Sequence, residues 1–200
     1  DLKGEVQKYL DDFLASIPKN EWNGIDCISE MRDAKDKNWR QGEWHGFYLE
    51  YLFKKYSTEH PNSQILYYAD KSEDGIDFDL VFSEEDWIFG DLKADKEGED
   101  ILGNNYSSFD EVINNHGGQV IYVVIRCKTE PDRNHGYKTT QFWNQYRDED
   151  RRYLSMEEIR NGYGKKMKYS VIPQRAVFVR IDRTAYAILK KDPFHQGKNS

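Results

Sequence analysis

A run of nine residues at 119–127, with the sequence QVIYVVIRC, constrains the fold of this chain more than any other segment. β-Branched residues dominate the run, and it lacks the apolar–polar alternation of a strand with one face in water. Such a run is typical of a strand that is covered on both faces. It therefore predicts the central strand of a sheet that lies between other layers. A chain of 200 residues can bury such a sheet in a single domain, so we expect one domain over 1–200.

Other segments supply the remaining strands and the covering layers. Apolar residues recur at helical spacing over 6–17 and 39–56, which predicts two amphipathic helices. Short apolar runs at 65–68, 76–82 and 88–94 predict three strands. This alternation of segment types predicts an α/β (α+β) fold with a central mixed β-sheet flanked by helices.

Further local patterns predict the second half of the chain. Ser108 with Glu111 forms a capping-box pattern before a helix expected at about 109–116, and Ser155 with Glu158 repeats it. A short helix is expected near 141–147. The last apolar segment, 176–189, predicts a closing hairpin of two strands.

Charge and cysteine content restrict the function only loosely. The net charge is −7, but residues 1–100 carry 12 Lys and Arg against 25 Asp and Glu, whereas residues 101–200 carry 17 against 11. A basic second half is compatible with a nucleic-acid partner and equally with chance. Cys27 and Cys127 fit either free thiols or one long-range disulfide. No apolar run is long enough for a membrane segment.

Acidic side chains and one lysine interrupt the two strands at 76–82 and 88–94. Because side chains alternate across a strand, Asp77 and Asp79 share one face, and Asp91 and Lys93 share a face of the next strand. If the strands pair with Asp79 opposite Asp91, these charges gather in one patch, and Asp77 falls opposite Lys93. The register then decides whether a site exists.

Two carboxylates that face each other across a strand pair repel, and a divalent cation would offset the repulsion. Mg²⁺ is a hard cation that carboxylate oxygens and waters hold, so Asp79 and Asp91 are candidate ligands for Mg²⁺, or for another divalent cation such as Mn²⁺ or Zn²⁺. Lys93 could then orient a water and counter charge on a phosphoryl group. These residues predict phosphodiester hydrolysis. The competing interpretation is a half-exposed hairpin with a solvated charged face.

The strand sequences FDLVF and WIFGDLKAD, followed by a helix and a buried strand, resemble the PD-(D/E)XK, or restriction-endonuclease-like, nuclease superfamily over about 39–127. The Pro-Asp pair of the name is absent, since Phe78 precedes Asp79, and Asp91 stands where Glu is commoner. The resemblance implies a restriction-endonuclease-like catalytic core at 39–127, a helical lead-in at 1–38, and a basic substrate-facing part with the closing hairpin at 128–200. It also implies that Glu50, on the upstream helix, completes the catalytic and metal-binding set, with Glu43 as the alternative.

Within the superfamily, the segments WRQGEWHGFYLEYL, GDLKAD and DEVINNHGGQVIYVVI are similar to C-terminal toxin domains of contact-dependent growth inhibition systems. That resemblance implies an RNA-cleaving enzyme with tRNA as the favoured substrate and a cognate immunity protein as partner. It further implies a domain delivered from the cell surface as part of a larger protein and acting in the cytosol of a target cell. Otherwise a cytoplasmic protein is expected.

Basic residues of the second half are candidate phosphate contacts. They are Arg151, Arg152, Arg160, Lys165, Lys166 and Lys168, with Tyr163 or Tyr169 available to stack on an unpaired base. Three other functions stay open: a DNA endonuclease of the restriction or repair type, a metal-independent ribonuclease with His135 as general base, and a non-catalytic acidic interaction module.

Overall fold

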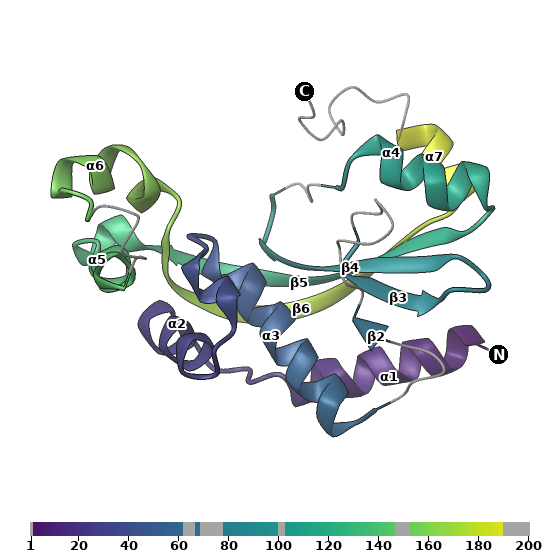
Figure 1. Cartoon of the computed structure of the whole chain (residues 1–200), viewed down its shortest axis with the longest axis horizontal. Coiled ribbons are helices and arrows are strands. Elements are labelled where there is room, and N and C mark those ends of the chain that lie inside the picture. The colour runs from purple at the N-terminus through teal and green to yellow at the C-terminus, as the bar shows by residue number, and fades with distance from the viewer. Residues whose placement is uncertain (1, 62–66, 69–77, 100–102, 147–152, 190–200) are drawn as a thin grey trace.

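The computed structural model describes residues 2–61, 67–68, 78–99, 103–146 and 153–189. Its described strands form one six-stranded sheet in the order β1-β6-β5-β4-β3-β2, in which only β4 and β5 run parallel (Figure 1). The strands are β1 (Trp22–Asn23), β2 (Tyr67–Tyr68), β3 (Leu80–Ser83), β4 (Ile88–Lys96), β5 (Gln119–Pro131) and β6 (Lys168–Ile181). The predicted central mixed sheet is thereby confirmed.

The segment 119–127 forms most of β5 and lies inside the sheet, as predicted. β5 pairs along its length with β4 on one edge and with β6 on the other. A parallel pair needs a crossover connection, and the helical segment between β4 and β5 supplies it. Both edges of β5 are hydrogen-bonded and both faces are covered, which explains its lack of alternation.

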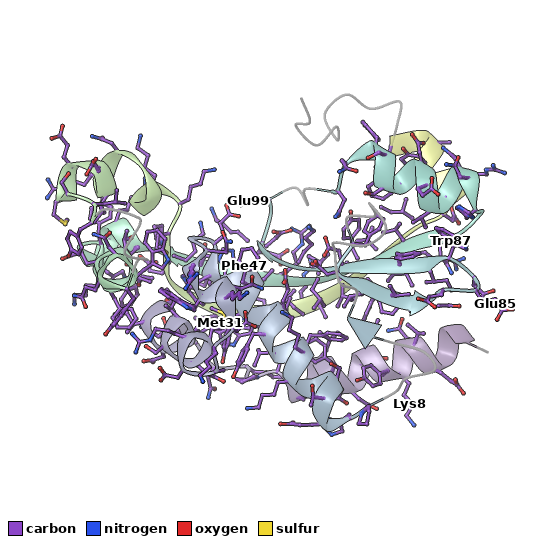
Figure 2. All side chains as sticks on the ribbon, in the orientation of Figure 1. Lys8, Met31, Phe47, Glu85, Trp87 and Glu99 are labelled. Carbon is purple, nitrogen blue, oxygen red and sulfur yellow. The ribbon has the colours of Figure 1, made fainter. Side chains whose placement is uncertain are left out.

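Helices cover both faces of the sheet (Figure 1). The first face packs on α1, α2 and α3, in a core that includes Met31 and Phe47, both labelled in Figure 2, together with Leu92 of β4. The second face packs on α4, the π-helical turn that follows it, and α7. The helices are α1 (Leu2–Ser16), α2 (Gly24–Asp33), α3 (Trp44–Glu59), α4 (Tyr106–Phe109), α5 (Lys138–Gln145), α6 (Met156–Asn161) and α7 (Arg183–Leu189).

Short turns complete the described structure. They are the 3-10 turns η1 (Lys37–Arg40), η3 (Asp132–His135) and η4 (Tyr163–Lys165), and the π-helical turn η2 (Asp110–Asn115). β5 and β6 extend beyond β4 as a long ribbon, which the short strand β1 joins at the outer edge of β6, with α5 and α6 at its far end (Figure 1).

The predicted closing hairpin at 176–189 is wrong. Its first half continues the long strand β6, but its second half is the helix α7. The side chain of Asp182 accepts hydrogen bonds from the backbone N–H groups of Thr184 and Ala185, which starts a helix rather than a turn between strands. Tyr186 then buries against the second face of the sheet.

The helix expected at 109–116 begins earlier, at Tyr106. Its N-terminal cap is Asn105, whose side chain accepts from the backbone N–H of Ser108, so Ser108 is not the cap. The second capping box is confirmed, because Ser155 and Glu158 exchange both of its hydrogen bonds. The helix expected near 141–147 is α5.

Cys27 and Cys127 are both free and buried, which answers the question of a disulfide between them. Burial raises the pKa of both thiols. Among the helices of the described ranges, none combines the length and apolar character needed to cross a membrane.

Candidate active site

Asp79, immediately before β3, meets Asp91 of the neighbouring strand β4. β3 and β4 pair Leu80 with Gly90 and Val81 with Phe89, and extending this antiparallel register by one residue places Asp79 opposite Asp91. Each aspartate is only 3% exposed. Phe89 packs in the core of the second face, so by alternation Asp91 lies on the face that α4 and α7 cover.

The sequence permits this close packing through a glycine. A Cβ on Gly90 would lie 2.4 Å from the ring of Phe82 and 2.5 Å from the backbone oxygen of Ile121. Both distances are shorter than real Cβ contacts, so only glycine lets β4 run this close to its neighbours immediately before Asp91.

Lys93 extends the cluster along β4. Its Nζ lies 2.8 Å from Oδ2 of Asp91, and its side chain is 26% exposed. The same Nζ lies 5.7 Å from the ring centroid of Tyr122, the β5 residue opposite Asp91. The lysine therefore already neutralises part of the charge that the sequence placed in this patch. The predicted partner across the hairpin, Asp77, lies outside the described residues.

Burial raises the pKa of Asp91 well above the usual carboxyl range. A hydrogen bond with Asp79 and the negative charge of Asp79 raise it further, and the ammonium of Lys93 opposes them. The pair thus holds a shared proton more tightly than two separate carboxyls would. Oδ1 of Asp91 is buried and has no hydrogen-bond partner among the described residues.

Asp95 is a further acidic residue that the sequence argument missed. It follows Lys93 by two residues on the same strand face. Its pKa is raised, first by burial, although the charges of Lys93 and Arg126 lower it. Its Oδ2 is also buried with no partner among the described residues. Continuing the two-residue alternation beyond Lys93 would have found it.

Glu50 is buried on α3, at 8% exposure. In the part of the chain that the structure describes, no three His, Cys, Asp or Glu side chains are arranged to hold one metal ion. The structure therefore does not bring Glu50 to Asp79 and Asp91 as a third ligand, and its role stays a prediction. Glu43 precedes α3, and its negative charge contributes to the raised pKa of Asp95.

The described basic residues lie away from the carboxylates. Lys168 pairs with Pro131, nine residues along β5 from Tyr122. At about 3.3 Å per residue, this distance is ~30 Å. Lys165 and Lys166 are exposed near the same end of the ribbon, with Arg160 on α6. They cannot contact a phosphate held at Asp91.

Some of the predicted substrate contacts cannot be placed. Arg151 and Arg152 lie outside the described residues, as does the side chain of Tyr163. Tyr169 stacks on His135 with ring centroids 3.8 Å apart, and Nε2 of His135 lies 3.6 Å from Glu130. His135, the candidate general base of a metal-independent ribonuclease, thus sits at the far end of the ribbon.

The structure therefore brings together Asp79, Asp91 and Lys93, adds Asp95, and separates them from the basic end of the molecule. Comparison of the chain with protein-family models, with curated proteins and with solved structures finds no match.

Proposed function

We propose that this chain is a metal-dependent nuclease that hydrolyses phosphodiester bonds, and in particular an RNA-cleaving toxin domain. One observation carries the proposal: two aspartates that are each 3% exposed face each other across two strands, with a lysine 2.8 Å from one of them. Burying like charges together destabilises a sheet, so such a cluster is better explained by chemistry than by stability.

The residues present suit a hard divalent cation. Asp79 and Asp91 offer carboxylate oxygens, and Oδ1 of Asp91 has no hydrogen-bond donor among the described residues. Mg²⁺ is commonly held by one or two protein carboxylates together with waters and substrate phosphate, so two aspartates are sufficient without Glu50. When bound, the cation would supply Lewis-acid polarisation of the phosphoryl group.

The chain's own residues have separable roles in this proposal. The raised pKa of Asp91 favours a proton shared with Asp79, and this proton must leave before both carboxylates can serve as ligands. The ammonium of Lys93 is held by Oδ2 of Asp91. Its positive charge can orient a water or counter the negative charge on a phosphoryl oxygen. The covering second core keeps bulk water from the carboxylates.

The RNA preference, the toxin role and the immunity partner rest on the resemblance to contact-dependent growth inhibition toxins. The basic far end of the ribbon is compatible with a large folded substrate such as tRNA, because it lies ~30 Å from the carboxylates. A DNA endonuclease would share the same core, and the test below includes DNA for that reason.

The acidic interaction module is less well supported. A docking surface for a basic partner must present its carboxylates to solvent, but Asp79 and Asp91 are buried and Lys93 already pairs with one of them. The carboxylates are therefore poorly placed to attract a protein partner.

The purified chain should be incubated with total tRNA, with single-stranded and duplex DNA, and with plasmid DNA, each in Mg²⁺ or in EDTA. We expect Mg²⁺-dependent cleavage of RNA that Asp91→Asn abolishes and Lys93→Met slows strongly. The matched control is Lys96→Met, because Lys96 lies on the same strand, is exposed, and pairs only with the exposed Glu99 among the described residues. Cleavage that persists in EDTA would exclude the metal, and intact substrates in every condition would exclude the nuclease.

A further inference from the structure

A cavity of about 300 Å³ opens beside the candidate active site, on the second face of the sheet. Residues of β5 and β6 form its floor, and residues of α4 and α7 form its walls. Figure 1 shows these helices over the same side of the strands. The volume is at the small end for ligand cavities, which suits one flat ring system rather than an extended molecule.

Four aromatic rings line this cavity. They come from Tyr106, Phe109, Tyr122 and Tyr186. Phe109 and Tyr186 stack with centroids 5.3 Å apart, and Phe109 lies 6.3 Å from Tyr122. The rings therefore support one another and form fixed walls. Rigid aromatic walls bind flat rings through stacking, which every nucleobase can accept.

Polar groups are present at defined points of these walls. The hydroxyl of Tyr106 is buried and has no hydrogen-bond partner among the described residues. A ligand reaches this hydroxyl only when the Tyr106 side chain turns toward the cavity, and a hydrogen bond formed there would be favourable because a buried hydroxyl without a partner is not. Arg126 also lines the cavity, and its Nη1 donates to the carbonyl of Glu99, which Figure 2 labels beyond the end of β4. An arginine held in this way can stack on a ring or meet a phosphate.

The cavity shares a wall with the carboxylate cluster. Tyr122 lines the cavity, stands opposite Asp91 across β4 and β5, and has its ring 5.7 Å from Nζ of Lys93. The hydroxyl of Tyr122 is fixed, because it donates to Oδ1 of Asn104 and accepts from the backbone N–H of the same residue at 3.0 Å. A nucleotide whose phosphate lies at Asp91 and Lys93 therefore has its base next to this wall.

We propose that the cavity binds one unpaired nucleobase of the substrate strand, next to the phosphodiester that is cleaved. The inference rests on the proposed nuclease function and deepens it, because a cavity of this size excludes a base pair. The enzyme would then act on single-stranded segments and loops and would spare continuous duplex.

Gly103 provides a clean way to fill the cavity. It lines the cavity, and a Cβ added there would lie 3.6 Å from the hydroxyl of Tyr122 and 3.7 Å from the ring of Phe109, which are ordinary contacts. Gly103→Leu should therefore fold and place its side chain where the base would lie. Gly46→Leu is the matched control, because a Cβ on Gly46 meets nothing within 4 Å.

The experiment measures binding of a short single-stranded RNA that carries 2-aminopurine, in EDTA so that metal-dependent cleavage cannot occur. We expect stacking in the cavity to quench the 2-aminopurine fluorescence. Gly103→Leu should weaken the affinity by roughly ten- to a hundredfold, the range expected for loss of one stacked base, whereas Gly46→Leu should leave it unchanged. Thermal melting of both variants verifies that they fold.

Tyr106→Phe is the second variant, because it removes the buried hydroxyl and keeps the ring. We expect it to lower the affinity several-fold and to reduce the differences among probes with other bases beside the label. Absence of quenching with the native chain, or unchanged affinity in both folded variants, overturns the nucleobase site. Cleavage in Mg²⁺ is measured separately. Cleavage without quenching would reject the nucleobase site but not the nuclease. Quenching without cleavage of any substrate would reject the nuclease and leave a nucleotide-binding cavity.

Discussion

Replacing Asp91 by asparagine should stabilise the metal-free protein and abolish the proposed cleavage of RNA. The amide has nearly the shape of the carboxyl group but no charge, so it removes the repulsion with Asp79 across the strands. Substituting a residue that stabilises the fold normally lowers the stability of the protein, whereas substituting a residue needed for chemistry often raises it. The sign of the change therefore separates the two explanations of this cluster.

The pH dependence gives the size of the effect. The pKa of Asp91 is raised in the folded chain, so between the unfolded value near 4 and the raised folded value the native state binds more protons than the unfolded state. Stability then falls as pH rises through that window, by at most ~1.4 kcal/mol per pH unit. Lys93 and local water reduce this slope, so we expect the gain from Asp91→Asn at pH 8 to exceed the gain at pH 5 by about 2 kcal/mol.

Urea unfolding of both proteins at pH 5 and pH 8 in EDTA measures this difference. Asp33→Asn is the control, because Asp33 is 71% exposed and lies 3.5 Å from Arg32, and it should show no such dependence. Added Mg²⁺ should stabilise the native chain, by about 2.7 kcal/mol at one hundred times its dissociation constant, but not the Asp91→Asn variant. A gain that is equal at both pH values, or a loss of stability at pH 8, would refute the reasoning.

Three other perturbations test separate parts of the molecule. Lys93→Met should lower the rate of cleavage by at least about a hundredfold with little change in binding of the substrate in EDTA, and Lys96→Met should change neither. Burial lowers the pKa of His45 to about 4, so the folded protein keeps this ring neutral. The free energy of unfolding then falls as the pH drops from about 6.5 towards 4, by up to ~2 kcal/mol between pH 7 and pH 5. His45→Gln should reduce this loss, which urea unfolding at the two pH values measures. Replacing Lys165 and Lys166 together by alanine should weaken binding of whole tRNA and reduce its salt dependence, without affecting a five-nucleotide RNA.

The main features of the fold were predictable because they depend on local patterns with one physical meaning. The continuous apolar run at 119–127 fits a strand covered on both faces, and the structure places it there as β5. The segment 182–189 was predicted wrongly because its short continuous apolar run at 185–189 fits a strand as well as a helix. The side-chain cap from Asp182 decides between them, and a strand interpretation gave that residue no role.

The site was only partly predictable. The alternation of side chains along each strand indicates which residues of neighbouring strands lie together, but it does not show how far apart residues lie along the sheet. The two-residue period places Asp79 and Asp91 together once the strands pair. The aromatic cavity depends on Gly103, Tyr122 and Tyr186, which are far apart in sequence and meet only when α4 and α7 pack on the sheet. Counting charges by halves of the chain likewise could not show that Lys168 lies ~30 Å along β5 from the carboxylates.

The asymmetry of the Asp91 carboxyl is the strongest reason to look for a ligand at this site. A buried ion pair that serves only structure should satisfy every oxygen, because each unsatisfied buried acceptor costs about 1–3 kcal/mol. Here Lys93 meets Oδ2, while Oδ1 has no partner among the described residues, and Asp95 leaves its own Oδ2 in the same condition. Residues that do not suit the fold around them are often found at functional sites, and in this sheet such residues lie along one face of β4. A bound cation and a phosphate would provide partners for those oxygens and for Lys93. Replacing Asp91 by an apolar residue or by asparagine would suit the fold but would remove the ligand for the cation.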